Sequence, residues 1–364
     1  MSGSIPNPPS ILGLLEAHRP QNTTSWELPP WGSILNYGVY PFFIFVEEHF
    51  IPIGTAFCIS DIGIVITATH NIEEALKLDR QDQLLSHLND LRGAATFNLR
   101  DVGLSLLQVQ LNGSNMQVNF RPLENGSIVR PTDVMFGFQS FRQGASLLPL
   151  RISFVPPRIG SKVICLGYTA TDPPSACISK EAFESGEIKD WFEAYTHRFC
   201  AIEGTVTKIF TKSFAPCKGA CFAIDAEVPH GLSGGPVFNE DGNVCGVSSL
   251  GAYDSDGHPI FLVSMLYPSL MTEINYGVSM GALRINASDR LLDLIGKGRI
   301  QTDGSEKLLP ITFTDGSPRI GLAIHKEDSP HVFDDRHGPE ENKQATKESR
   351  ETYRLRWKTP DESE

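Results

Sequence analysis

The segment from His230 to Pro236 reads His-Gly-Leu-Ser-Gly-Gly-Pro and places Ser233 among glycines, between two strand-like segments. Ser233 is therefore expected on a tight turn, where glycine adopts backbone conformations closed to other residues and leaves room for a substrate chain. In such a turn the backbone N–H groups of Gly231 and Ser233 would point at one spot and stabilise the oxyanion of a tetrahedral intermediate. A shorter Gly-x-Ser-Gly is often an ordinary loop, but the full motif between strands predicts a nucleophilic serine.

A serine hydroxyl is a weak nucleophile and needs a base within hydrogen-bond reach. The chain offers ten histidines. His70 ends the apolar run GIVITAT and opens a segment with helical spacing, so its ring would be fixed at a rigid strand end. The others lie in terminal or polar segments, adjoin the serine on its own turn, or suit surface or core positions. We therefore predict that His70 is the general base.

Two aspartates are candidates for the residue that orients this base. Asp101 starts the segment DVGLSLLQV and Asp133 starts the similar segment DVMFGFQ. An acid at a strand end would accept the Nδ1 proton of His70, hold the tautomer and stabilise the imidazolium. The spacing from His70 alone leaves both candidates open.

Composition excludes several other classes of function. The 364 residues include 31 Lys and Arg against 43 Asp and Glu, which gives a formal charge of -12. Neutralising phosphates requires a basic face, so we expect neither nucleic acid nor an anionic membrane surface as a partner. No apolar run reaches the ~18–20 residues that cross a bilayer, and the first residues lack a signal-peptide pattern, which predicts a cytoplasmic protein.

Cysteine usage agrees with a reducing compartment. There are seven cysteines, an odd number, so at least one stays unpaired within the chain. Cys217 and Cys221 are close enough in sequence for a local pair, although two loop thiols are the plainer interpretation. No second Cys or His pair has ligand spacing, so we expect no metal and no other cofactor. The sequence carries no signal for an oligomeric state.

The elements that must position these residues read as strands. Many short segments rich in β-branched and aromatic residues are separated by turn signals, which predicts an all-β antiparallel sandwich or barrel. Asn-Gly pairs at 112–113 and 125–126 and Asp-Gly at 241–242 indicate turns. Residues 71–91 have helical spacing with an interruption near Asp79, and residues 269–279 are a possible helix.

Composition also divides the chain into four parts. Residues 1–37 form an irregular extension rich in Pro, Ser and Asn, and residues 38–286 form the main domain. Residues 287–327 form a small extension, for which we expect a short helix and a hairpin. Residues 328–364 are highly charged with few apolar side chains, which predicts disorder.

Four segments resemble trypsin-like serine peptidases, especially their bacterial and cytosolic branch. They are GTAFCISDIGIVITATH, TDVMFGFQ, PPRIGSKVICLGY and AIDAEVPHGLSGGPVFNEDGNVCGVSS, in the family's order of His, Asp and Ser. The resemblance covers roughly residues 38 to 275. It implies two packed six-stranded antiparallel barrels of the chymotrypsin type, divided near residues 145–155, with a His-Asp-Ser triad in the cleft between them.

The resemblance also favours Asp133 over Asp101. PPRIGSKV and LGY follow Asp133, as in the family's passage from its acid to the second barrel. Asp101 is followed by an alternating run and an Asn-Gly turn, so it is interpreted as a solvated turn carboxylate.

The family further implies where the primary specificity pocket lies. Its walls would be Asp225 to Val228 before the nucleophile, and Ser249, Leu250 and Gly251 on the later strand. Glu227 stands where digestive relatives place the base of the pocket, and there it would favour a basic substrate side chain. The looser bacterial-type match is equally compatible with an apolar preference.

The sequence therefore predicts a serine endopeptidase that hydrolyses polypeptide substrates through an acyl-enzyme. The alternative is a catalytically silent peptide-binding module on the same fold. An acyl-transfer enzyme of the α/β-hydrolase type requires parallel βαβ units and the order Ser, acid, His. This chain has His70 before Ser233 and few helical segments, which argues against that class.

Overall fold

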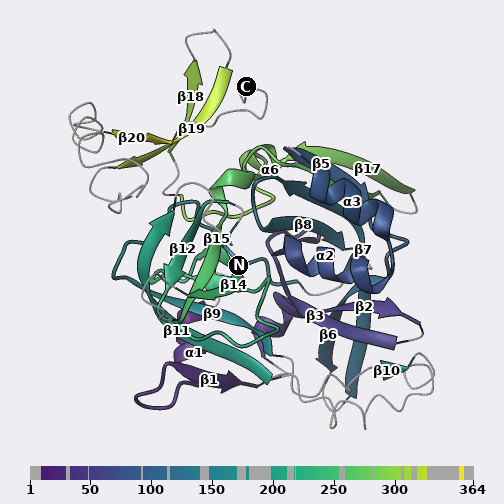
Figure 1. Ribbon diagram of the computed structural model, residues 1–364, viewed down its shortest axis with the longest axis horizontal. Coiled ribbons are helices and arrows are strands. Elements are labelled where there is room, and N and C mark those ends of the chain that lie inside the picture. The colour runs from purple at the N-terminus through teal and green to yellow at the C-terminus, as the bar shows by residue number, and fades with distance from the viewer. Residues whose placement is uncertain are drawn as a thin grey trace, which may run out of the picture.

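The computed structural model describes most of the main domain and parts of the extensions. The described residues are 10–29, 33–47, 49–91, 93–112, 115–139, 147–169, 178–179, 198–210, 217, 219–253, 259–280, 283–304, 307–312, 318–325 and 352–355. Their strands close into two six-stranded antiparallel barrels, accompanied by a few short helices (Figure 1). This confirms the all-β, chymotrypsin-like architecture that the sequence predicts.

The first barrel closes in the order β3-β2-β6-β7-β8-β4, with β4 returning to β3. Its strands are β2 (Val39–Val46), β3 (His49–Cys58), β4 (Ile64–Ala68), β6 (Leu104–Asn112), β7 (Asn115–Val129) and β8 (Val134–Gln139). Two short strands extend it: β5 (Ala94–Asn98) pairs with β7, and β10 (Ile178–Ser179) pairs with β3. Closure leaves the six barrel strands without a free edge.

The second barrel closes in the order β11-β12-β15-β14-β13-β9, with β9 returning to β11. Its strands are β9 (Lys162–Thr169), β11 (Arg198–Phe210), β12 (Cys221–Ile224), β13 (Pro236–Phe238), β14 (Val244–Tyr253) and β15 (Pro259–Met265). Strand β1 (Ser25–Leu28) adds to the long strand β11. The N-terminal helix α1 (Ile11–Glu16) is linked to β1, because the indole N–H of Trp26 donates to the carbonyl of Leu15.

Several strands are apolar on both faces because each face meets a different core. Along β8, Val134 and Phe136 belong to the core shared by the two barrels, while Met135 between them belongs to the interior of the first barrel. Along β4, Ile66 faces the shared core and Val65 faces the interior. Successive side chains of a strand point to opposite faces, so burying both faces requires an unbroken apolar run.

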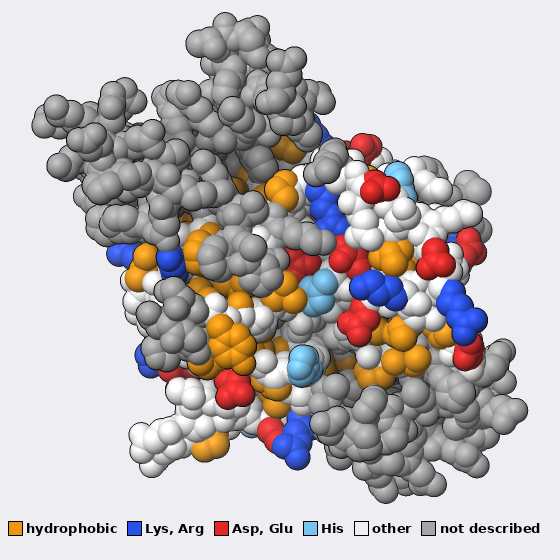
Figure 2. Space-filling model, in the orientation of Figure 1, with side chains coloured by type: hydrophobic (Ala, Val, Ile, Leu, Met, Phe, Trp, Pro, Cys, Tyr) orange, Lys and Arg blue, Asp and Glu red, His pale blue; other side chains and the backbone are white. Residues whose placement is uncertain are grey.

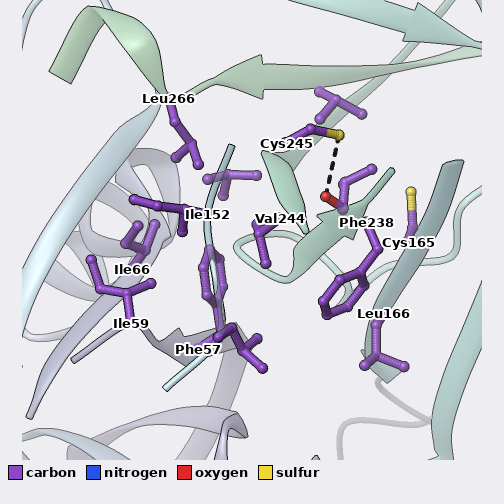
Figure 3. Close-up of a cluster of buried hydrophobic side chains, with 14 of the residues drawn as sticks. Phe57, Ile59, Ile66, Ile152, Cys165, Leu166, Phe238, Val244, Cys245 and Leu266 are labelled. Atoms are coloured by element: carbon purple, nitrogen blue, oxygen red, sulfur yellow. Dashed lines mark hydrogen bonds between the residues drawn. The ribbon is translucent and has the colours of Figure 1, made fainter. Parts of the chain in front are cut away.

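The shared core holds the barrels together. Figure 3 shows part of it, where Phe57, Ile59 and Ile66 of the first barrel face Leu166, Phe238 and Val244 of the second. Ile152 of the connecting segment lies between them and forms bridges with Val244 and Thr302. The cleft between the barrels is thus built on a common apolar support.

The two longest described helices follow β4 in the chain, and the shorter ones come before β2 or after β15. Helix α2 (Thr69–Leu78) follows β4 directly, and α3 (Asp82–Asp90) follows α2. The predicted interruption near Asp79 lies between these two helices. A short helix η1 (Ile34–Tyr37) precedes β2, η2 (Tyr267–Ser269) follows β15, and α6 (Leu291–Gly296) lies in the predicted short helix of the C-terminal extension.

Two local predictions are wrong. Asn125 and Gly126 lie inside β7, at a register shift in its pairing with β8, and not at a turn. A Cβ on Gly126 would lie 2.5 Å from the ring of Phe97, so a larger residue there would require that ring to move. Residues 269–279 contain no α-helix: Glu273–Met280 is strand β16, which pairs with β17 (Leu283–Arg290).

The C-terminal region carries a separate three-stranded sheet (Figure 1). Its strands are β18 (Lys307–Thr312), β19 (Pro318–His325) and β20 (Thr352–Leu355). Strands β18 and β19 pair as the expected hairpin. Of the segment predicted to be disordered, only 352–355 is described, and it pairs with β19. Within the described part of the chain, no helix has the length and apolarity to cross a membrane.

Candidate active site

The pairing of β4 with β8 brings His70 and Asp133 together. Ala68, the last residue of β4, pairs with Val134, the first residue of β8, so the residues just beyond these strand ends are neighbours. The Nδ1 atom of His70 lies 2.7 Å from Oδ2 of Asp133, and the backbone N–H of His70 donates to Oδ1 at 3.0 Å. Asp101 is instead an exposed residue of the turn before β6.

Asp133 also accepts hydrogen bonds from the first residues of helix α2. The first N–H groups of a helix have no partner within it, and Ala68 at the N-cap supplies no side-chain acceptor. The N–H of Thr69 donates to the Asp133 carbonyl at 3.2 Å, and that of His70 donates to the carboxylate. The helix end and the imidazole are therefore held by one residue.

The electrostatics of this pair favour an ionised carboxylate. Burial by itself would raise the pKa of Asp133, but the charge of His70 and its hydrogen bonds outweigh burial and lower the pKa below its usual value. Burial would lower the pKa of His70, yet the Asp133 carboxylate brings a net rise. An ionised Asp133 requires the proton on Nδ1, which leaves Nε2 of His70 as the acceptor.

Ser233 lies on the loop between β12 and β13, as the motif predicts. Gly231 and Gly234 have φ angles of 97° and 86°, conformations in which other residues are strained. The N–H of Gly234 donates to the carbonyl of Ser248 at 2.7 Å, which ties the loop to β14. Among the described residues, the N–H groups of Gly231 and Ser233 have no hydrogen-bond acceptor.

The hydroxyl of Ser233 donates to the carbonyl of Ser249 at 3.0 Å. The hydroxyl of Ser249 in turn donates to Oδ2 of Asp133. Ser249, which the sequence assigns to the substrate pocket, thus lies between the serine and the aspartate. The described structure gives no hydrogen bond between Ser233 and His70, and such contacts are often loose in a site without substrate.

Two residues that the sequence analysis did not single out fix the serine loop to the first barrel. The hydroxyl of Thr55 donates to the carbonyl of Gly231 at 2.8 Å, and the backbone N–H of Thr55 donates to the carbonyl of Ser233 at 2.9 Å. The side-chain amide of Asn71 donates to the same Ser233 carbonyl at 2.9 Å. Thr55 lies within the segment GTAFCISDIGIVITATH and Asn71 directly follows it, but only the tertiary structure reveals these contacts.

A cavity of about 500 Å³ opens over these groups between the two barrels. Both barrels contribute to its walls. The lining residues are Pro52, Ile53, Gly54, His70, Asn71, Glu74, Tyr168, Val228, Pro229, His230, Gly231, Ser233, Ser249, Leu250, Gly251 and Phe261. On the face in Figure 2, histidines lie near the centre, with hydrophobic side chains gathered toward the second barrel and charged ones over the first.

The residues expected around the specificity pocket divide into two groups. Val228, Ser249, Leu250 and Gly251 line the cavity. Glu227 is exposed and is not part of that lining. Asp225 is turned to β11, where its carboxylate accepts the N–H of Thr205.

The described residues include no group of three or more His, Cys, Asp or Glu side chains suited to hold a metal ion. Six of the seven cysteines lie in described segments, where each is buried as a free thiol; Cys177 lies outside them. Cys217 and Cys221 are both in this group.

Several solved structures are similar in fold. The MamO protease domain from Magnetospirillum magneticum, in its apo form, is 12% identical with a TM-score of 0.39, over 64% of this chain and 93% of that chain. The Rv3671c protease from M. tuberculosis, in its active form, is 17% identical with a TM-score of 0.38, over 64% and 78% of the two chains. Deg5 is 14% identical with a TM-score of 0.37, over 59% and 80%.

No curated protein sequence matches the chain. The sequence profile of the trypsin-like peptidase domain matches residues 54–247, which is more than half of the chain. This range contains His70, Asp133 and Ser233 and runs from β3 of the first barrel to β14 of the second. The chain therefore belongs to the trypsin-like peptidase family.

Proposed function

We propose that the chain is a serine endopeptidase, with Ser233 as nucleophile, His70 as general base and Asp133 as the residue that orients the base. The observation that carries this proposal is the contact of 2.7 Å between His70 Nδ1 and Asp133 Oδ2 in a cavity that Ser233 also lines. This contact leaves Nε2 of His70 as the acceptor for a hydroxyl proton.

The reaction would begin when Ser233 exchanges its present acceptor, the carbonyl of Ser249, for Nε2 of His70. The serine oxygen then attacks the substrate carbonyl carbon as its proton moves to His70, and Asp133 stabilises the imidazolium. The N–H groups of Gly231 and Ser233 would receive the oxyanion. His70 next gives the proton to the leaving amine, and water hydrolyses the acyl-enzyme by the same route.

The test is labelling with a fluorophosphonate, followed by incubation with a casein-type substrate. We expect the wild type to be labelled and to cut the substrate, and Ser233→Ala to do neither. Ser161→Ala is a matched control, because this serine lies on a turn outside the cavity lining. A folded wild type that binds peptides but resists the label would instead be the silent peptide-binding module.

We also propose that the pocket beside Ser233 receives an apolar side chain. Val228, Leu250 and Phe261 line the cavity, whereas the Glu227 carboxylate does not. The cavity lining does include the carboxylate of Glu74, but that residue lies on helix α2 beside the first barrel and not among these apolar residues of the second. Burying a substrate ammonium against apolar walls without a carboxylate is unfavourable. Matched peptides should therefore be cut faster after Leu or Val than after Arg or Lys, and Glu227→Gln should leave this preference unchanged. Faster cleavage after Arg that is lost in Glu227→Gln would restore Glu227 to the pocket.

A further inference from the structure

The side chain of Asn71 links the segment that carries His70 to the segment that carries Ser233. It is the next residue after His70 in helix α2 and is only 1% exposed. Its Nδ2 atom donates to the carbonyl of Ser233 at 2.9 Å and to the hydroxyl oxygen of Thr67 at 3.1 Å. One side chain of the first barrel thus contacts the main chain of the proposed nucleophile in the second.

The neighbours of Asn71 require an amide nitrogen at this position. The Ser233 carbonyl can only accept, and it also receives the N–H of Thr55 at 2.9 Å. The hydroxyl of Thr67 donates its proton to the carbonyl of Thr55 at 2.7 Å, so toward Asn71 it acts as an acceptor. Both contacts of Asn71 therefore need N–H donors, which fixes the orientation of its amide.

Packing leaves the amide little room to move. A Cβ on Gly54 would lie 2.4 Å from Nδ2 of Asn71, and a Cβ on Gly234 would lie 2.8 Å from it. Two glycines from different barrels therefore enclose the side chain. A buried donor held this closely restrains the carbonyl that it contacts, and it loses that effect when the donor is removed.

We propose that Asn71 is a positioning residue that sets the place of the Ser233 main chain relative to His70. This proposal rests on the proposed serine peptidase function. Asn71 follows the base in sequence and holds the carbonyl of the nucleophile, so displacing its amide changes the geometry between the two. A misplacement of about 1 Å between reacting groups can cost on the order of 100-fold in rate.

The kinetic test uses Asn71→Leu, which keeps the approximate volume without a donor, and Asn71→Asp, which keeps the shape but faces the Ser233 carbonyl with an oxygen. Both should lower the rate of fluorophosphonate acylation and the kcat on a peptide about 10- to 100-fold, with KM within about threefold. In Asn71→Leu, which adds no charge, the acid limb of the pH–rate profile should stay in place, because the His70–Asp133 contact is untouched.

Ile72→Val is the matched control. Ile72 is the next residue of α2 and is fully buried in the first barrel, but it faces the interior core and not Ser233. The Ile72→Val substitution should lower thermal stability without slowing acylation by the fluorophosphonate. Acylation at the wild-type rate by both folded Asn71 variants would overturn the proposal. Slowing by Ile72→Val equal to that of Asn71→Leu would also overturn it, since stability alone would then explain the loss.

Amide hydrogen exchange gives a readout that needs no activity. The backbone amides of Thr55 and Gly234 form hydrogen bonds that involve the serine loop. Without the Asn71 donor, these two amides should exchange at least about 10-fold faster. In Ile72→Val their exchange rates should not change. A wild type inert to the fluorophosphonate would overturn the proposed function and the catalytic part of this inference. The structural link would then stand or fall on exchange: unchanged rates at both amides in Asn71→Leu would refute it.

Discussion

Three hydrogen bonds converge on the carboxylate of Asp133, from the backbone and ring of His70 and from the hydroxyl of Ser249. A carboxylate that accepts several hydrogen bonds is stabilised in its charged form. Its charge then supports a proton on His70 and raises the pKa of the imidazole above its ordinary value. Asp133 thus acts both on the tautomer of His70 and on the pH at which His70 becomes neutral.

The pH dependence of kcat/KM should report this effect. In the wild type, kcat/KM should fall as the pH drops through the raised pKa of His70, because a protonated imidazole cannot accept the serine proton. Asp133→Asn removes the charge that raises this pKa while burial still lowers it, so the acid limb should move to lower pH. The kcat at neutral pH should also fall by about 10⁴-fold, because the amide favours the wrong tautomer.

Asp101→Asn is the control for this substitution. Asp101 is exposed and lies in the turn before β6, so its replacement should leave both kcat and the acid limb nearly unchanged. Steady-state kinetics from pH 5 to 9 would test both variants. If Asp101→Asn were the damaging change, the two assignments would have to be exchanged.

Ser233 and His70 should behave as one unit. We expect Ser233→Ala to lower kcat by about 10⁴-fold or more with the fold retained, and His70→Ala to be nearly as damaging. The double variant should be little worse than either single one, because each removes the same step. Single-turnover kinetics on a peptide would measure this, and losses that multiply in the double variant would show that the two residues act independently.

At the scale of elements, the loop from β12 to β13 depends on a conformation that glycine permits. Gly234 has a φ of 86°, and a Cβ there would lie 2.2 Å from the carbonyl of Thr55 and 2.3 Å from the hydroxyl of Thr67. The loop therefore approaches β3 and β4 at a distance that excludes any side chain. This approach allows Ser233 to contact the first barrel.

Gly234→Ala should consequently lower the free energy of unfolding by about 2 kcal/mol or more, since it combines backbone strain with a clash against main chain. Gly251→Ala is a matched control, because a Cβ on Gly251 would meet nothing within 4 Å, and it should change stability by less than ~0.5 kcal/mol. Urea unfolding curves with equal slopes would measure both. Equal midpoints for the two variants would contradict the close approach.

At the scale of the whole molecule, the chain returns to the core between the barrels after both are complete. Ile300 is 2% exposed within the shared core and bridges to Ser60. The N–H of Ile152 donates to the carbonyl of Gln301 at 3.0 Å, and the N–H of Asp303 donates to the carbonyl of Ile152 at 3.1 Å. The segment around 300–303 is therefore part of the support beneath the cleft.

Two truncations should separate this segment from the charged tail. Removing 328–364 should leave kcat/KM on small peptides within about twofold, a change worth only ~0.4 kcal/mol, because the tail is poor in apolar residues. Removing 299–364 also deletes the buried Ile300, whose loss should cost about 2–5 kcal/mol of stability. Thermal unfolding and peptide kinetics would compare them. Equal effects would show either that the tail is required or that the 300–303 segment is dispensable.

Local sequence patterns determined the all-β class and the serine loop. Apolar strands interrupted by turn residues predict antiparallel sheet, and the glycines around Ser233 permit the positive φ angles found at Gly231 and Gly234. The pattern failed at residues 269–279, predicted as helix, where Glu273–Met280 pairs with β17. A short apolar segment suits either element locally, and pairing with a second strand decides between them.

The tertiary structure alone decided which groups meet. Asp101 and Asp133 both start strand-like segments, and the family resemblance favours Asp133, but the contact itself depends on the β4–β8 register, which brings Asp133 to His70. Asn71 looks like a polar residue on a helix, yet the approach of the second barrel gives its amide the carbonyl of Ser233. The periodicity of the sequence encodes the face of an element on which a side chain lies. Barrel closure and barrel packing join distant segments, and they decide which other residue that side chain contacts.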